Sequence, residues 1–428
     1  MSMQSAFQAI EHAAHRCNGC RRCERCVPRC EVLGDAGCTV GEIATAFEPL
    51  AEGFDLSNEQ AREVCSLEIR TWALDNVQLV FAVQRCCMCS FCTQGCAAGV
   101  DARSLFVAVR EILALAHVTT DQGFESTQVD RQWDIFSVYR AVYGIDYADL
   151  PHMGDAVACD ADTLFFPGCP LVSYAPELTR EIFTWLQSHG MRVVLSETCC
   201  GSPLKAAGFA DRALAFKQSI AHAIADAGIR RVVCVCPGCM DELREPAVGM
   251  DGIEFVPLPQ LLVDAGVRID ATRIRCAAGI SLDNVDSLRV AVCDSCHDRE
   301  GNFGIPLREL FDDSLLYELR HNGSDALCCG AAGAVSLVDP DICTRRAQRV
   351  LDEGFAVADL MVANCPTCSY TFAAQGRAGV VDATGMPYAH CNYLDVVFEA
   401  SFDWDTIFSQ LEGMWSGEYG PWVCQQLT

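Results

Sequence analysis

The sequence between residues 168 and 368 contains one cysteine pattern twice: Gly168-Cys169, Cys199-Cys200-Gly201 and Cys236-Pro237-Gly238-Cys239, then Cys296-His297, Cys328-Cys329-Gly330 and Cys365-Pro366-Thr367-Cys368. The lone cysteine precedes the cysteine pair by 29 intervening residues in the first copy and 31 in the second. In both copies 34 residues separate the glycine from the closing C-x-x-C. Ten cysteines in one repeated order indicate a duplicated metal-binding module.

The composition is that of an acidic, cysteine-rich globular protein. A chain of 428 residues has room for about three domains at roughly 150 residues each. The excess of 57 acidic over 31 basic residues argues against nucleic acid and anionic lipid as general partners. Met1 to Arg16 lacks the pattern of a secretion signal, and no apolar run reaches the roughly 18 residues of a membrane span. We therefore expect the 29 cysteines to be thiolate ligands in a reducing cytoplasm.

Two more cysteine runs precede the repeat, both spaced C-x-x-C-x-x-C-x-x-x-C: Cys20, Cys23, Cys26, Cys30 and Cys86, Cys89, Cys92, Cys96. In this ferredoxin-type spacing three cysteines wrap around one cubane, and the fourth ligates the neighbouring cluster. The spacing predicts one 4Fe–4S cluster on Cys20, Cys23, Cys26 and Cys96, and a second on Cys86, Cys89, Cys92 and Cys30. Zinc is the alternative, because C-x-x-C pairs also suit tetrahedral zinc.

Some details of these two runs depart from the usual pattern. The proline that commonly follows the fourth cysteine is replaced by Glu31 and Ala97. Cys17 extends the first run backwards, but a shifted register would need its fourth ligand at Val27. Cys17 and Cys87 are therefore expected to be spare thiols.

Only Arg85 adjoins the second run, whereas five arginines surround the first: Arg16, Arg21, Arg22, Arg25 and Arg29. Guanidinium groups stabilise the extra negative charge of a reduced thiolate-bound cluster, and they could dock an acidic electron donor. A solvated face without a specific role is the alternative.

Strands and helices alternate after residue 160. Apolar segments at 163–166, 192–196, 231–236, 288–292 and 360–363 predict strands, and a helix is expected near Pro306 to Leu319. This alternation predicts an α/β fold with parallel sheets and ligands at strand ends. We expect an N-terminal all-α two-cluster ferredoxin-like domain followed by two duplicated α/β modules. The predicted boundaries are 1–115 for the ferredoxin-type domain, 116–160 for a helical connector, 161–275 and 285–402 for the modules, and 403–428 for a C-terminal tail.

Each module offers five cysteines where a cubane needs four. Either one cysteine is idle, or the cluster has an unusual shape in which a thiolate bridges irons. The glycine after each adjacent pair permits a left-handed turn that could bring both sulfurs to one site. A vicinal disulfide and zinc are the structural alternatives. Cys234 lies two residues before Cys236 and is expected to be a buried, inert thiol.

Both five-cysteine motifs resemble those of the CCG-domain iron–sulfur family, above all heterodisulfide reductase. A chain with the ferredoxin part in front resembles the D-type form of that enzyme, in which its C and B polypeptides are fused. The similarity covers nearly all of residues 15–400. By position, the resemblance implies one non-cubane 4Fe–4S cluster on Cys169, Cys199, Cys200, Cys236 and Cys239, and another on Cys296, Cys328, Cys329, Cys365 and Cys368. The family often has proline before the cysteine–histidine pair, where this chain has Ser295.

The resemblance implies that two cubane clusters relay electrons to two non-cubane clusters, which reductively cleave a disulfide to two thiols. His297 is the candidate proton donor, with a hydrogen bond to a cluster sulfur as its alternative role. Lys205 could attract an anionic substrate group, or it could be a surface lysine.

Two functions follow from this resemblance. The first is an oxidoreductase of the disulfide reductase type. The second is an electron-transfer protein that links a dehydrogenase to a membrane quinone-reactive complex. No G-x-G-x-x-G fingerprint is present, so electrons must come from a partner, either a flavoprotein or a membrane protein like a b-type cytochrome. We expect a place in anaerobic metabolism, with the chain in the cytoplasm and peripheral to the inner face of the membrane within a complex.

Overall fold

The computed structural model describes residues 10, 15, 23–52, 59–118, 124–276, 288–381, 385 and 388–427. Cys17, Cys20, Arg16, Arg21 and Arg22 lie outside these residues. The chain divides into two compact units. The first comprises Met1–Asp130, Pro203–Ala215 and Gly330–Cys343, and the second comprises Arg131–Ser202, Phe216–Cys329 and Thr344–Thr428. The first unit therefore includes a short segment that follows each cysteine pair.

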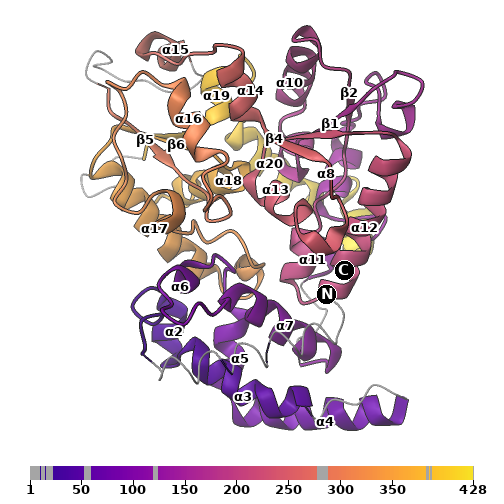
Figure 1. Cartoon of the computed structure of the whole chain (residues 1–428), viewed down its shortest axis with the longest axis vertical. Helices are drawn as coiled ribbons and strands as arrows, with labels where there is room; N and C mark the ends of the chain where they lie inside the picture. The colour runs from indigo at the N-terminus through magenta and orange to yellow at the C-terminus, as the bar shows by residue number, and fades with distance from the viewer. Residues whose placement is uncertain are drawn as a thin grey trace. The chain divides into compact units, whose positions relative to one another are not determined.

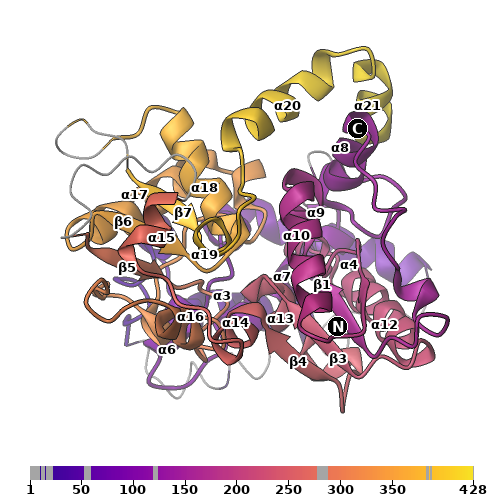
Figure 2. The same cartoon turned by 90° about the horizontal axis from the view of Figure 1, so that it is seen from above.

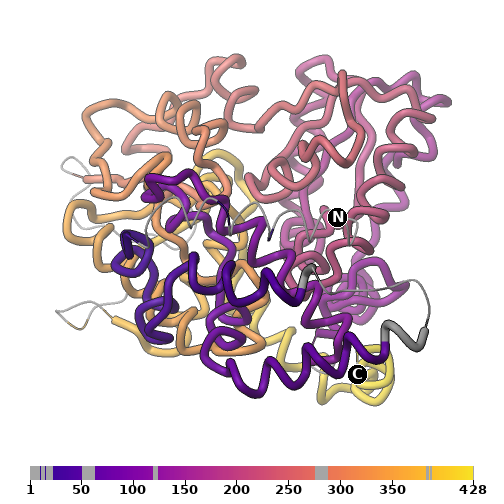
Figure 3. Tube along the Cα trace, turned by 60° about the horizontal axis from the view of Figure 1, so that its bottom comes forward, coloured from indigo at the N-terminus to yellow at the C-terminus, as the bar shows by residue number. Residues whose placement is uncertain are grey.

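The N-terminal part of the first unit consists of helices joined by loops where the structure describes it (Figure 3). Its helices are α2 (Glu31–Ala36), α3 (Val40–Glu52), α4 (Glu59–Asp75), α5 (Val77–Gln84), α6 (Phe91–Gln94) and α7 (Ala102–Leu115). Helix α7 begins where Asp101 accepts a hydrogen bond from the backbone N–H of Ser104, which satisfies one free donor of the first turn. From Leu105 to Ala114 every residue of α7 is buried, so this helix is the core of the unit.

Helix α7 also buries a carboxyl group, that of Glu111. One of its oxygens accepts the backbone N–H of Asp211 at 3.0 Å. Burial, reinforced by the charge of Asp211, raises the pKa of Glu111 to about 7 from a usual value of 4.5. Because the folded state binds this proton more tightly than the unfolded chain, Glu111 lowers stability as pH rises from about 4.5 to 7.

Substitution Glu111→Gln is therefore expected to remove a pH-dependent loss of stability. The variant should match the parent near pH 4 and exceed it above pH 7 by at most about 3 kcal/mol, at 1.36 kcal/mol per pKa unit. Thermal unfolding followed between pH 4 and 8 measures the difference. Glu63→Gln, on an exposed position of α4, is the control and should leave the pH profile unchanged.

The first sheet of the second unit is parallel and has the order β2-β1-β3-β4. Its strands are β1 (Thr163–Phe166), β2 (Val193–Leu195), β3 (Arg231–Cys234) and β4 (Glu254–Pro257). The connecting helices include α9 (Cys169–Tyr174), α10 (Pro176–Ser188), α11 (Ser202–Ala206), α12 (Ala210–Asp226), α13 (Pro237–Leu243), α14 (Leu258–Asp264) and α15 (Ala271–Cys276) (Figure 1). Strands β1 and β3 have strand neighbours on both sides, and their residues are nearly all apolar and buried, as parallel strands require.

The second sheet is also parallel, with the order β5-β6-β7. Its strands are β5 (Val290–Cys293), β6 (Leu360–Ala363) and β7 (His390–Asn392), with helices α16 (Gly304–Leu310), α17 (Pro340–Phe355), α18 (Pro366–Arg377) and α19 (Tyr393–Val397). The predicted α/β class with parallel sheets is thus confirmed.

The prediction of a helix near Pro306 to Leu319 is wrong for the second half of this range. Helix α16 ends at Leu310, and Asp312 turns the chain by accepting the backbone N–H of Ser314. The next residues run beside β5, where Tyr317 donates its backbone N–H to the carbonyl of Val290 at 2.8 Å. Pairing with the sheet edge replaces the helical hydrogen bonds that the apolar spacing suggested.

The C-terminal tail packs on a helix of the predicted connector. Helices α20 (Trp404–Ser416) and α21 (Gly420–Leu427) both contact α8 (Ile135–Tyr143) (Figure 2). Tyr143 donates its hydroxyl to the carbonyl of Gln410 at 2.6 Å, and Tyr139, Met414 and Val423 are buried together. The tail therefore covers part of the second unit. None of the helices in the described ranges combines the length and apolar character of a membrane span.

Candidate metal centres

The cysteines of the repeat lie where strands end. Strand β3 leads to Cys236 and β6 leads to Cys365, and each of these cysteines occupies the N-cap position of the helix that follows. Proline at the first helical position has no N–H to lose and fixes the helix direction, so C-P-x-C places both of its sulfurs at a helix N-terminus. Strand β1 similarly leads to Cys169 at the start of α9. Carboxyl ends of parallel strands are where α/β sheets bind ligands.

Eight of the ten repeat thiols form one continuous series. Each contacts the next in the order Cys169, Cys199, Cys200, Cys239, Cys236, Cys365, Cys368, Cys329. The two copies meet at Cys236 and Cys365, whose Sγ atoms are 4.0 Å apart. All eight residues are buried, as are Cys296 and Cys328. The two five-cysteine sets therefore face each other within the second unit.

The adjacent pairs turn as the sequence predicts. The glycines after them, Gly201 and Gly330, have φ of 81° and 91°, in the left-handed region. A Cβ atom on Gly330 would lie 2.7 Å from the Cα of Cys343, so no larger residue fits there without movement.

Close contact between the thiols of this series shifts their pKa values strongly in both directions. Contact with neighbouring thiols raises the pKa values of Cys199, Cys239 and Cys368 far above their usual range. Hydrogen bonds from neighbouring thiols lower the pKa values of Cys200 and Cys365. So many buried thiols cannot all ionise without nearby positive charge, and bound iron supplies such charge.

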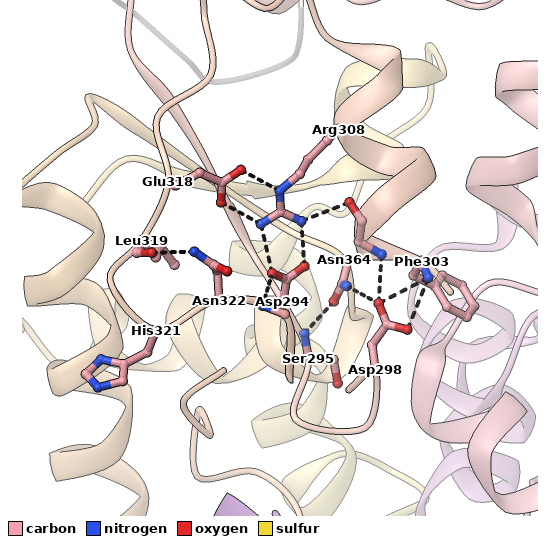
Figure 4. Close-up of polar contacts among 12 residues, drawn as sticks. Asp294, Ser295, Asp298, Phe303, Arg308, Glu318, Leu319, His321, Asn322 and Asn364 are labelled. Carbon is pink, nitrogen blue, oxygen red and sulfur yellow. Dashed lines mark hydrogen bonds and ion pairs between the residues drawn. The ribbon is translucent and has the colours of Figure 1, made fainter. Parts of the chain in front are cut away.

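A polar network holds the loop that carries Cys296 (Figure 4). Asp294 is buried and accepts two hydrogen bonds from the Arg308 guanidinium, at 2.9 and 2.8 Å. Asp298 accepts the backbone N–H groups of Phe303 and Gly304. These contacts fix the loop at both of its ends.

The same network ties the Cys296 loop to the strand before Cys365. Asn364 accepts the backbone N–H of Ser295 at 2.8 Å and donates its side chain to Asp298. The hydroxyl of Ser295 accepts the backbone N–H of His297 at 3.3 Å. Proline, which the family often has at this position, lacks a backbone N–H and could not donate this hydrogen bond to Asn364. Ser295 therefore adds a hydrogen bond that a proline would not make.

His297 reaches across from the second copy to the first. Its Nδ1 lies 2.9 Å from a carboxylate oxygen of Asp241, on helix α13 two residues after Cys239. The His297 side chain is 11% exposed. A carboxylate at Nδ1 fixes the orientation of the ring and directs Nε2 the other way.

The ferredoxin-type cysteines gather in the first unit. One cavity is lined by Cys23, Cys26 and Cys96 together with Cys92. Burial raises the pKa of Cys92, and the nearby Cys86, Cys30 and Cys26 raise it further. Around these loops Glu24, Met88 and Ser90 adopt positive φ values of 57°, 51° and 58°, a backbone conformation that is uncommon for non-glycine residues.

Three further residues named in the sequence analysis, Arg29, Lys205 and Cys234, differ in burial and in the groups they contact. Arg29 stacks 4.0 Å from the Phe91 ring and donates to the Phe91 carbonyl, so it joins the two cysteine runs. Lys205 is half-buried on α11, within the first unit. Cys234 is fully buried, and burial raises the pKa of its thiol.

Three residues near the sulfurs were not identified in the sequence. Asp241 pairs with His297, and no spacing pattern links them. Tyr393 is fully buried beside Cys236 and Cys365, and its hydroxyl donates to the Val235 carbonyl at 3.3 Å. Cys38 lies near Cys30 and Cys26, and burial raises its pKa to about 11. Cys38 lies two residues before the start of helix α3 and belongs to no regular spacing.

The donor set fits iron–sulfur clusters. It consists of closely placed soft thiolates, without a histidine or carboxylate in the series. In the described parts of the chain, no three His, Cys, Asp or Glu side chains converge closely enough to hold a single metal ion. A cluster instead distributes its thiolates over several irons.

Comparison with known proteins identifies the repeat. A family model of the cysteine-rich CCG domain matches residues 163–244 and 290–373. An uncharacterised iron–sulfur protein of Methanocaldococcus jannaschii is 24% identical over 74% of this chain and 60% of its own length. The C component of the anaerobic glycerol-3-phosphate dehydrogenase of Escherichia coli is 26% identical over 55% of this chain and 59% of its own length.

A third relative extends the comparison. The D component of the dihydromethanophenazine:CoB–CoM heterodisulfide reductase of Methanosarcina barkeri is 24% identical over 67% of this chain and 71% of its own length. The chain thus spans about three fifths of the first two relatives and somewhat more of the third.

Proposed function

The chain carries the cysteine-rich CCG domain twice and is related to iron–sulfur subunits of oxidoreductases, and on that premise we propose that it reductively cleaves a disulfide. The reaction adds two electrons and two protons to one S–S bond and releases two thiols. The observation that carries the proposal is the approach of Cys236 to Cys365 at 4.0 Å. Because this contact joins the two five-cysteine sets, two one-electron donors would flank a single bond.

The first unit would supply the electrons. Cys20, Cys23, Cys26 and Cys96 would hold one cubane 4Fe–4S cluster, and Cys86, Cys89, Cys92 and Cys30 the other. Each CCG domain would hold one non-cubane 4Fe–4S cluster on its five cysteines. Electron transfer from the second ferredoxin-type run toward the second cysteine pair is supported by Cys87, whose Sγ lies 3.8 Å from the carbonyl oxygen of Gly330. Gly330 directly follows Cys329 in the sequence.

His297 would position a proton for the departing thiolate. Asp241 holds Nδ1 of the ring, so a proton on Nε2 would point away from that carboxylate. His297 directly follows Cys296 and contacts the helix of Cys239, so it lies beside both sets of proposed ligands. Lys205 remains a candidate for attracting an anionic substrate group.

Substitution Asp241→Asn is expected to lower the rate of disulfide cleavage by about tenfold and to leave the iron content unchanged. The rate should fall because a carboxylate would no longer hold the His297 imidazole in its orientation. Loss of a group that orients a reactive side chain typically has an effect of this size. Turnover and iron content measured on the same sample test it. Asp251→Asn, at an exposed turn between α13 and β4, is the matched control and should keep full activity.

The second candidate function is electron transfer without disulfide chemistry. It is favoured by the similarity to the glycerol-3-phosphate dehydrogenase component, whose name does not refer to a disulfide. In both cases the electrons would come from a partner protein, either a flavoprotein or a membrane cytochrome-like protein. The chain would then work in the cytoplasm or at the inner face of the membrane.

An anaerobic assay separates the two functions. The purified chain is reduced with a viologen dye, and small-molecule disulfides of different charge are added. Dye oxidation with release of two thiols per disulfide supports the proposal. If the chain has its full cluster content but none of the added disulfides is reduced, and electrons pass only to a quinone or a protein acceptor, the second function is established instead.

A further inference from the structure

Helix α7 carries a buried guanidinium group, that of Arg110, which has no role in the electron transfer proposed above. Arg110 is 5% exposed and lies in the core of the first unit. An arginine has five N–H donors in a fixed plane. All five are used here, and every acceptor that the structure describes for them is a backbone carbonyl.

The five carbonyls come from three separate segments. Arg110 Nε and Nη2 donate to the carbonyls of Val83, Gln84 and Cys86, at 3.0, 2.7 and 2.7 Å. Its Nη1 donates to Ala206 and Gly333, both at 2.6 Å. The first three carbonyls belong to the end of α5 and the start of the second ferredoxin-type run. The other two lie six residues after Cys200 and four residues after Cys329.

Close packing accompanies these hydrogen bonds. A Cβ atom on Gly333 would lie 2.3 Å from the Cys86 carbonyl oxygen, and one on Gly208 would lie 2.9 Å from the Arg110 carbonyl oxygen. The backbone that follows each cysteine pair therefore comes directly against α7 or the Cys86 loop.

The charge of Arg110 is not neutralised by any partner that the structure describes. Carbonyl dipoles solvate the guanidinium but do not cancel its charge, and buried charges act over longer distances than exposed ones because water and salt do not screen them. The thiols of Cys86 and Cys87 lie close enough to interact electrostatically with the Arg110 guanidinium. A positive charge at this point favours added negative charge on whatever Cys86 holds.

We propose that Arg110 is a positioning residue that raises the reduction potential of the cubane cluster bound by Cys86, Cys89, Cys92 and Cys30, while it fixes the two segments that follow the cysteine pairs. This inference rests on the proposed clusters. The group that Arg110 stabilises is the reduced, more negative cluster, which lies before the CCG domains in the direction of electron flow. Net charge and nearby hydrogen bonds are known determinants of cluster potential.

The test compares three variants of the full chain with loaded clusters. Arg110→Met removes the buried charge. Gly208→Ala disturbs the same packing, because the added Cβ meets the Arg110 carbonyl oxygen at 2.9 Å in a backbone with φ of 98°, yet it keeps the charge. Arg212→Met removes a half-exposed arginine of the same unit whose charge is already paired with Asp130 at 2.7 Å. Iron content and circular dichroism identify variants that fold and load.

The readout is a redox titration of the cubane clusters by EPR. In Arg110→Met we expect the equilibrium for reducing one cubane cluster to weaken about tenfold, equivalent to a potential about 59 mV lower for one electron. The other cubane should keep its potential, and both should be unchanged in Gly208→Ala and Arg212→Met. If Arg110→Met cannot fold, Arg110→Lys, which keeps a cation but offers only three donors, should lose stability and keep the potential at neutral pH.

Two outcomes would overturn the inference. Unchanged potentials in loaded Arg110→Met would show that the charge does not act on the cluster. Equal shifts in Arg110→Met and Gly208→Ala would show that packing, and not charge, controls the potential. If the parent protein itself contains no cubane cluster, the proposed function fails, and this result is distinguishable from both.

Discussion

Substitution Cys236→Ser is expected to remove about four irons per chain, the content of one 4Fe–4S cluster, and to abolish disulfide cleavage. Cys236 is buried at the N-cap of α13, in contact with Cys239 and 4.0 Å from Cys365. A serine hydroxyl is a poor substitute for a soft thiolate ligand. Because this position lies where the two cysteine sets meet, its loss should also change the EPR spectrum of the cluster on the other side.

Cys234→Ser is the matched control for that experiment. It replaces the buried cysteine that ends strand β3, two residues before Cys236 and outside the proposed ligand set. We expect the variant to keep its iron. Iron content equally reduced in both variants would mean that the loss reflects damage to the strand, and full iron content in Cys236→Ser would exclude this residue as a ligand.

Substitution Lys217→Met is expected to lower the free energy of unfolding by about 3–5 kcal/mol, the usual consequence of removing one partner from a buried ion pair. The Lys217 side chain is 1% exposed and lies 2.9 Å from Glu242, which is 2% exposed, and 2.5 Å from Glu245. Removal of the lysine leaves the Glu242 carboxylate buried without its cation. Glu242 lies one turn after Cys239 on α13, so the damage should reach the metal centre as well.

The double variant Lys217→Met/Glu242→Gln separates charge from packing. It removes the buried negative charge together with the positive one, so we expect it to recover most of the lost stability. Thermal unfolding of the parent, the single and the double variants measures this directly. A single variant that melts within about one degree of the parent would contradict the ion pair as described, since a loss of this size shifts the midpoint by several degrees.

Much of the second unit could be predicted from the sequence because its signals are local. Short apolar runs that end in Gly-Cys or C-P-x-C define a buried strand, a turn and a helix start within a short stretch of chain, and the pattern predicts a strand at Leu360–Ala363, where the structure has β6. The glycines at 201 and 330 predict left-handed turns for the same reason. The duplication reinforces each of these signals.

Contacts between distant segments could not be predicted. His297 and Asp241 are 56 residues apart, and Arg110 binds carbonyls up to 223 residues away. Carbonyl acceptors leave no trace in a sequence, because every residue has one. The apolar spacing after Leu310 suggests a helix, but pairing with β5 gives a better partner to the backbone.

Disulfide cleavage between two cluster-bearing CCG domains is tested most directly by anaerobic purification, followed by iron counting and EPR with a thiol added. Four 4Fe–4S clusters correspond to roughly sixteen irons per chain. We expect that iron content, together with a new paramagnetic signal when a thiol is added to the oxidised protein. A chain with only cubane signals that do not respond to thiols would contradict disulfide cleavage between the two CCG domains.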